Sequence, residues 1–389
     1  MSRKLTTIFM FSFFISLVEM SLFNTYIGLF LKNAKFLESF QIAQMMSINF
    51  LVSLVSGFLI GFIIDALTDY KPLLIGSLIL LFIAIWIWIR FDSVNSVYAA
   101  FFLYNFSKGP ILRLQDMLVS EAGHQKLIDI GKTRGFASVG YATAPLIFSS
   151  FFINGAINYD LLMITIVFLV TITSGLLIYS SKFVKFGNNS TLKKEFKWNR
   201  TLIINLAFII VMSFVFNATN GLNVMYQSIY FEQIFGTVQP LGLLVLIGSV
   251  LEWPVMIRTS KLLQAYGYQR MFTLLALLVS CRWLIYYFAG SLSNMPLFFI
   301  AASLNGVAQA IFVPVSMTYL RGISTSQNYG VILSVYGTIG TILSWLFNQS
   351  IAIFQKSYGL QQVYLLMAAL SFIWFGLLLL KKLKYQEYT

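Results

Sequence analysis

The chain has 389 residues, of which 58% are hydrophobic and only 10% are charged, and its formal net charge is +13. A water-soluble protein of this length needs a far larger charged fraction on its surface, so the composition excludes a soluble globular protein. It indicates a chain that is mostly surrounded by lipid.

Apolar stretches follow one another along almost the whole chain, with mostly short connections. A helix that crosses a bilayer needs about 20 predominantly apolar residues, and each stretch is of that length. The sequence therefore predicts an all-α membrane protein with twelve transmembrane helices. We expect these helices near residues 5–31, 40–65, 72–90, 94–120, 134–154, 160–181, 200–229, 237–257, 270–289, 293–320, 328–352 and 359–380.

Lysine and arginine are distributed unevenly between the two sides of this arrangement. If the amino terminus is inside, most of them lie in inner loops, and only Lys32, Lys35, Arg90 and Lys356 lie in outer loops. The positive-inside rule then predicts a protein of the cell (plasma) membrane with both termini cytoplasmic. Because the positive charges are scattered over separate loops, we expect the lipid bilayer as a partner and no nucleic acid.

Several common signals are missing from the sequence. The first apolar stretch is too long for a signal peptide, and no small-residue cleavage site follows it, so we expect a retained helix. The one cysteine, Cys281, lies within a predicted helix, and the one histidine, His124, lies in a charged inner loop. No nucleophile–base pair, phosphate loop or metal cluster is recognisable. We expect no enzymatic activity, no metal and no cofactor.

The longest inner connection divides the chain into two sets of six predicted helices. It reads SKFVKFGNNSTLKKEFKWN and is polar and basic. We expect an amino-terminal half at residues 1–181, a cytoplasmic linker at 182–199, and a carboxy-terminal half at 200–389 with a short cytoplasmic tail. This plan resembles the major facilitator superfamily, in which an axis along the membrane normal relates the two halves.

The loop after the second predicted helix carries a second resemblance to this superfamily. It begins at Gly61 and places Asp65 and Asp69 in the pattern G-x-x-x-D, although Ala66 stands where the superfamily has a basic residue. The resemblance implies a conformational latch, in which these acids pair with a base such as Arg134 in one state and release it in another. A plain polar loop is the alternative.

Six charged residues fall within predicted helices: Glu19, Lys108, Arg113, Asp116, Glu252 and Arg282. Such charges cost about 2.5–3.5 kcal/mol each on insertion scales and mark functional pathways. Glu19 and Lys108 lie near the same depth, so we expect Lys108 to pair with Glu19 or to contact the substrate. Glu252 and Arg282 would meet only if the helix ends lie a few residues from their expected positions. Static ion pairs that set helix register are the alternative to proton coupling.

Uncharged polar residues line one face of the stretch 200–229. Asn217, Asn220, Asn223 and Gln227 fall within about 120° of arc on a helical wheel. Asn305 and Gln309 lie on the stretch 293–320. Amides in lipid need partners or water, so these residues predict a polar cavity that binds substrate, with helix–helix hydrogen bonding as the alternative.

Two further segments resemble the branch of phenylpropionate permease, nucleoside–proton symporters and lactose permease. One reads GPILRLQD from Gly109, followed by IGKTRGFASVGY from Ile130, and the other places an E-x-P pattern before an R-W-x-x-Y pattern. The resemblance implies functional roles for Asp116, Arg134, Glu252 and Arg282.

The expected function is alternating-access transport, with proton-coupled symport of a small polar organic solute such as a sugar, nucleoside or aromatic acid. We expect proton coupling by Glu252, Glu19 and Asp116. Expected substrate contacts are Lys108, Asn217, Asn220, Asn223, Gln227, Arg282, Asn305 and Gln309. The partners are then the small-molecule substrate, protons and lipid, and we expect a monomer.

Two alternatives stay open. One is a proton-driven efflux antiporter for drugs or sugars, although the G-P-x-x-G-G motif of exporters is reduced here to Pro145. The other is a lipid or lysolipid flippase, for which Lys108 and Arg113 would be head-group contacts.

Overall fold

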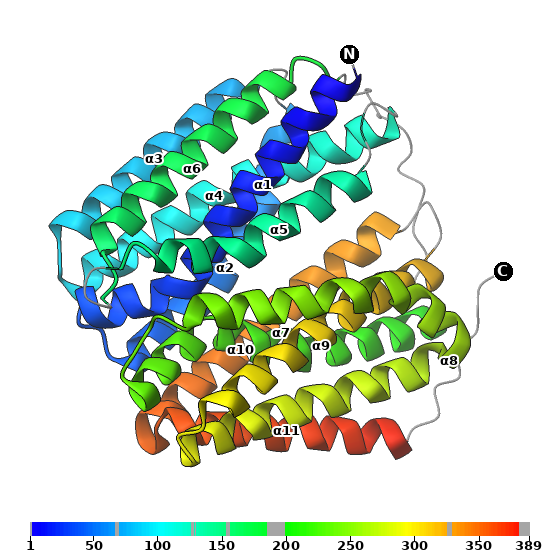
Figure 1. The fold of residues 1–389 in the computed structure, drawn as a ribbon. Helices are drawn as coiled ribbons and strands as arrows, with labels where there is room; N and C mark the ends of the chain where they lie inside the picture. Colours follow the sequence, from blue (N-terminus) through cyan, green and yellow to red (C-terminus); the bar gives the residue numbers. More distant parts are fainter. Residues whose placement is uncertain are drawn as a thin grey trace. The chain divides into compact units, whose positions relative to one another are not determined.

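The structure is a computed structural model, and it describes residues 2–66, 70–125, 128, 130–152, 156–184, 199–324 and 329–380. These residues form helices joined by short connections (Figure 1). In chain order the elements are α1 (Ser2–Leu29), the π-helical turn η1 (Phe30–Ala34), α2 (Ser39–Ala66), α3 (Lys71–Arg90), α4 (Val94–His124), α5 (Ile130–Ser149), α6 (Tyr159–Ser180), α7 (Arg200–Phe235), α8 (Leu241–Ser291), α9 (Met295–Gly322), α10 (Tyr329–Tyr358) and α11 (Leu360–Leu380). The prediction of an all-α membrane protein is confirmed.

Helix α3 shows most clearly that lipid is the solvent. Leu74 and Leu81 are buried against other helices, while Ile79 and Trp86 are more than half exposed on the outside of the protein. A helix that is hydrophobic on all sides and not enclosed by protein requires an apolar surrounding. Within the described residues, eight helices are long and apolar enough to cross a membrane. The count of twelve stays a prediction.

Helix α8 joins two stretches that the sequence places in separate spans. It is 51 residues long and is interrupted only at Gly267, whose φ is 73° and ψ is 168°. Positive φ is readily adopted by glycine because it has no Cβ, so this residue turns the chain between two helical segments. The loop expected between residues 257 and 270 is thus almost entirely helical, and the turn is confined to one residue.

The chain divides into two compact units. The first comprises Met1–Ser190 with Thr237–Leu243, and the second comprises Thr191–Gly236 with Leu244–Thr389. The predicted boundaries at 181 and 200 stay a prediction, because residues 185–198 of the expected linker lie outside the described residues.

In the first unit, α1 is the helix around which others gather. It packs along α5 and α6, while α4 packs against α2 and α3, and α3 also contacts α6 (Figure 1). Ser21 on α1 donates a hydrogen bond of 2.6 Å to the carbonyl of Tyr141, and Tyr26 donates one of 2.8 Å to the carbonyl of Pro145. These bonds tie α1 to α5 and position the middle of α1 inside the unit.

In the second unit, α7 contacts α9, α10 and α11. The first segment of α8 approaches α9 backbone to backbone, because a Cβ on Gly306 would clash with the carbonyl oxygen of Gly248. Thr259 adds a hydrogen bond of 3.0 Å to the carbonyl of Ala310. Small residues at a membrane helix contact permit this approach, and they place Glu252 beside α9.

The expected conformational latch cannot be located. Asp69 lies outside the described residues, as do the side chains of Asp65 and Arg134.

Candidate functional site

A buried ion pair lies inside the first unit. The Lys108 Nζ contacts one carboxylate oxygen of Glu19, and the Tyr104 hydroxyl donates a hydrogen bond of 2.5 Å to the other. The Glu19 side chain is 1% exposed and that of Lys108 is 12% exposed. Because a paired charge is far cheaper to bury than a single one, the two residues neutralise each other within the membrane. The predicted pairing of Glu19 with Lys108 is confirmed.

Helical periodicity explains why Tyr104 joins this pair. It precedes Lys108 by four residues on α4, so both side chains project from the same face. Phe23 stacks on the Tyr104 ring at 4.4 Å between centroids, and Trp88 lies 5.4 Å from it. The ring that donates to the Glu19 carboxylate is thus held in an aromatic cluster. The sequence reasoning missed Tyr104, although its spacing from Lys108 was a usable signal.

The other two charges of α4 lie differently. Arg113 and Asp116 are both exposed on the surface of their unit. The sequence also places Asp116 within reach of Arg134 at the start of the next helix, and this contact stays a prediction because the Arg134 side chain lies outside the described residues. Arg113 and Asp116 therefore do not belong to the enclosed cluster around Glu19.

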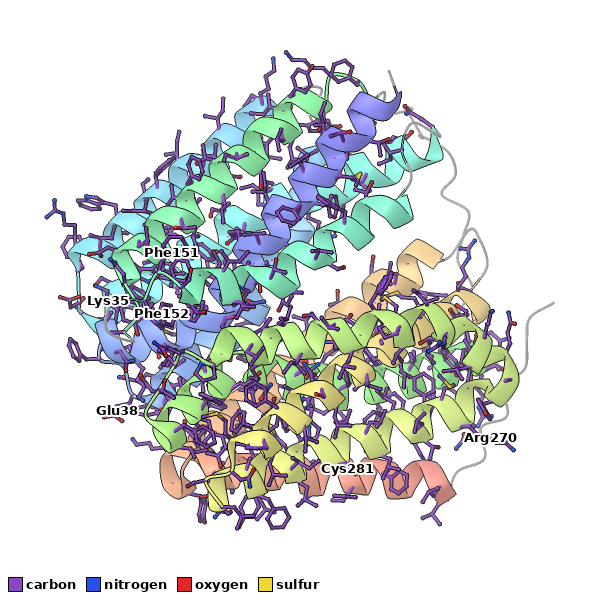
Figure 2. All side chains as sticks on the ribbon, in the orientation of Figure 1. Lys35, Glu38, Phe151, Phe152, Arg270 and Cys281 are labelled. Atoms are coloured by element: carbon purple, nitrogen blue, oxygen red, sulfur yellow. The ribbon has the colours of Figure 1, made fainter. Side chains whose placement is uncertain are left out.

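A buried cation of a different kind lies in the second unit. Arg282 is fully buried on the second segment of α8, next to Cys281, which Figure 2 labels. Its Nη1 donates a hydrogen bond to the side-chain oxygen of Asn305 on α9. Its Nε and Nη2 have no hydrogen-bond partner among the described residues. Two nitrogen donors of this buried guanidinium therefore form no hydrogen bond, and leaving a buried donor unbonded costs free energy.

Aromatic side chains surround the Arg282 guanidinium. Its central carbon lies 3.6 Å from the centroid of Trp283, which is a cation–π distance. The Trp283 ring lies 5.9 Å from Tyr286 and 6.0 Å from Tyr364 between centroids, and Tyr364 stacks on Tyr230 at 4.7 Å. These rings come from α7, α8 and α11, and the sequence pattern R-W-x-x-Y signalled only two of them.

Glu252 does not pair with Arg282 in the described part of the chain. Its backbone nitrogen lies 3.4 Å from the position that a Cβ on Gly306 would occupy, so it sits directly beside α9. Its side chain is half-buried. The described residues show no Glu252–Arg282 pair, and the side chain that bonds Arg282 is that of Asn305, one residue before Gly306.

The amides of α7 do not share one environment. Asn217 is exposed, Asn220 and Gln227 are half-buried, and Asn223 is buried. Asn223 donates a hydrogen bond of 3.0 Å to Gln227 and accepts one of 3.2 Å from Tyr364 on α11. The Nδ2 of Asn220 has no partner among the described residues. Hydrogen bonds within and between helices thus account for the burial of the Asn223 amide, whereas the Asn220 Nδ2 donor is unbonded among the described residues.

On α9, Gln309 lies one turn after Asn305, and both are half-buried. The same helix therefore contributes the Arg282 partner, the glycine contact with α8 and a further amide. Together with α7 and α8, it carries the site residues that the sequence predicts in the second unit.

Known proteins similar to this chain are transporters. The sequence profile described as the MFS_1 like family matches residues 4–379. The uncharacterized transporter YwbF of Bacillus subtilis (strain 168) is 25% identical over 293 residues, which cover 74% of this chain and 70% of that protein.

Solved structures give the same fold. A crystal structure of nucleoside transporter NupG matches with a TM-score of 0.79 at 13% identity, covering 97% of this chain and 99% of that one. Peptide transporter POT in complex with sulfate matches with a TM-score of 0.79 at 10% identity, covering 97% of this chain and 94% of that one. With its twelve predicted spans, buried charges and family profile, the chain belongs to the MFS_1-like family of major facilitator transporters.

Proposed function

We propose that this transporter is a proton-coupled symporter of a small polar organic solute, working by alternating access. It would act as a monomer in the plasma membrane with both termini in the cytoplasm. The observation that carries the proposal is the enclosed contact of Glu19 with Lys108 and Tyr104.

A carboxylate in this setting can act as a proton site. While Lys108 touches Glu19, the two charges cancel. If a rearrangement of α1 against α4 withdrew the ammonium group, the carboxylate would be left as an uncompensated buried charge, which a proton neutralises. Proton uptake would then be linked to helix movement, which is what coupling requires. Glu252 is a second proposed proton site, because its half-buried carboxylate lies beside the tight α8–α9 contact.

The expected solute class rests on neutral polar groups. Asn220, Gln227 and Gln309 are half-buried amides, which suit the hydroxyl, amide or carbonyl groups of a sugar, nucleoside or aromatic acid. The similar solved proteins are named as a nucleoside transporter and a peptide transporter, and this supports a small polar solute. None of the described residues specifically favours the efflux or flippase alternative.

Transport by purified protein in proteoliposomes tests the proposal. Radiolabelled sugars, nucleosides and aromatic acids are offered outside vesicles with an alkaline interior, and a trapped pH dye reports proton entry. We expect uptake of one class above its external concentration, accompanied by proton entry and abolished by a protonophore. Accumulation that persists without the gradient would contradict proton coupling, and extrusion against proton entry would establish the antiporter.

The role of Glu19 needs a variant that folds. In Glu19→Gln/Lys108→Gln both charges are removed, so neither is left unpaired. We expect this variant to exchange the solute but not to accumulate it, whereas Glu38→Gln, which changes an exposed carboxylate of the same unit (labelled in Figure 2), accumulates normally. Full accumulation by the double variant would show that Glu19 is not the proton site. Glu252 would then be the remaining proposed site, and Glu252→Gln should abolish accumulation.

A further inference from the structure

We propose that Arg282, supported by Asn305 and Trp283, binds a carboxylate carried by the transported solute. The inference rests on the proposed function, since it names the chemical class of the solute. It would make the transporter selective for organic monoanions over their neutral analogues.

The first argument is the missing counter-charge. Arg282 is fully buried, and an arginine keeps its charge in proteins. Glu232 and Glu252 are the acidic residues that the structure describes in the second unit, and neither forms an ion pair with it. A buried charge without a partner is strongly unfavourable, and neither the Asn305 amide nor the Trp283 ring supplies a counter-charge. An anion from outside the chain would supply one.

The second argument is the shape of the unused donors. Nη1 is occupied by Asn305, and the free groups are Nε and Nη2. These two N–H bonds lie on the same edge of the planar guanidinium and point in parallel. That edge matches the two oxygens of a carboxylate in a bidentate pair. Asn305 and the Trp283 ring hold the other edge and one face, so the free edge is preorganised.

The third argument limits the charge and body of the ligand. The groups in contact with the guanidinium, Asn305 and Trp283, are neutral, so a single positive charge awaits a single negative one. A carboxylate carries one negative charge and so balances the one positive charge of Arg282. A phosphate dianion carries two and would need a second cation. Tyr286 and Tyr364 add flat apolar faces next to Trp283, which favour a solute with a ring or another apolar body.

Ligand binding to purified protein in detergent tests the site without requiring transport. The probes are benzoate, cinnamate and lactate, each compared with its primary amide, and the readout is the thermal unfolding midpoint as a function of ligand concentration. We expect at least one carboxylate to raise the midpoint of the wild-type protein while its amide does not. Arg282→Gln should weaken that apparent affinity by about tenfold to a hundredfold, since hydrogen bonds to a charged group are lost.

Two further variants separate binding from a structural role. Arg282→Lys keeps the charge but loses the parallel donors, so its affinity should fall between those of the wild type and Arg282→Gln. Arg200→Gln removes an exposed charge at the start of α7 and should bind like the wild type. Without ligand, Arg282→Gln should unfold at the same or a higher temperature, because an unmatched buried charge is gone, whereas loss of a structural arginine would lower the midpoint.

Three outcomes would overturn the inference. They are equal binding of every carboxylate to the wild type and Arg282→Gln, no shift by any carboxylate, and equal competition by acid and amide for the transported solute. In the last case proton-coupled uptake can still occur, so the proposed function would stand while this site fails. Conversely, Arg282-dependent carboxylate binding without proton-driven uptake would support the site and refute the proposed coupling.

Discussion

Among the described residues, each unit encloses a cation between its helices, Lys108 in the first and Arg282 in the second, and the two cations have different partners. In the first unit Lys108 touches Glu19, so the charge is neutralised by the chain itself. In the second unit Arg282 touches the amide of Asn305 and keeps two donors unused. The difference shows that burial of a charged side chain does not by itself indicate a ligand-binding site. A cation with an internal acid is neutralised within its own unit, whereas Arg282 leaves two donors unbonded, and for these we have proposed an anionic ligand.

The largest expected effect comes from breaking the internal pair of the first unit. Either Glu19→Gln or Lys108→Gln alone leaves a buried charge unpaired and should destabilise the protein by about 3–5 kcal/mol. Expression level and the thermal unfolding midpoint in detergent measure this. The double variant should recover most of the loss. If both single variants are as stable as the wild type, the pair contributes nothing to folding and the contrast between the units disappears.

The next effect concerns the backbone contact of α9 with the first segment of α8, one residue away from the Arg282 partner Asn305. Gly306→Ala puts a methyl group against the carbonyl oxygen of Gly248, so α8 and α9 must separate, at about 1–3 kcal/mol. Gly340→Ala on α10 is the matched control, since a Cβ there meets nothing within 4 Å. We expect a lower unfolding midpoint for the first variant only. Equal midpoints would show that the α8–α9 contact is looser than described.

Two amides of α7 sharpen the distinction between satisfied and unsatisfied groups. Asn220 has an unused donor, whereas Asn223 is bonded to Gln227 and Tyr364. Asn220→Ala should therefore raise the half-saturating solute concentration by about tenfold to a hundredfold, equivalent to about 1–3 kcal/mol. Asn223→Ala should mainly lower the unfolding midpoint. Half-saturating concentrations come from proteoliposome uptake and midpoints from thermal unfolding. If Asn223→Ala weakened solute binding and Asn220→Ala lowered the unfolding midpoint, Asn223 would be the solute contact and Asn220 the packing residue.

Giving the second unit an internal acid should make it resemble the first. Asn305→Asp has nearly the same shape and places a carboxylate against Arg282, which should stabilise the unliganded protein by about 1–2 kcal/mol through a charge-assisted hydrogen bond. The same change should weaken carboxylate binding, measured by the ligand-induced thermal shift. Unchanged carboxylate affinity would mean that the ligand charge is not met at Arg282.

The smallest effect is expected for an ion pair at the edge of the first unit. Lys35, labelled in Figure 2, contacts Asp92 at 2.6 Å, but the Asp92 side chain is 72% exposed. Solvent screening limits such pairs to about 1 kcal/mol or less, so Asp92→Asn should barely change the unfolding midpoint. If Asp92→Asn lowered the unfolding midpoint as much as Glu19→Gln, burial would not explain the difference in stability between the Lys35–Asp92 and Lys108–Glu19 pairs.

Part of the site was accessible from the sequence because helices have a fixed period. The shared depth of Glu19 and Lys108 predicted their contact correctly, and four-residue spacing could have added Tyr104. The α7 stripe was a less reliable guide. Its members do fall on one side of the helical wheel, yet Asn217 is exposed and Asn223 is bonded to Tyr364, because spacing does not say which neighbour packs there.

The solvent and the helical class followed from the residue pattern, because long apolar stretches can satisfy their backbone in lipid only as helices. The sequence profile showed the family. The partner of Arg282 in the second unit followed only from how the helices pack. Glu19 contacts Lys108 as their depth predicts, whereas Arg282 contacts Asn305 on α9 and forms no ion pair with Glu252 among the described residues. Contacts between helices distant in the chain depend on how their surfaces fit, and that fit is not encoded in the period of any single helix.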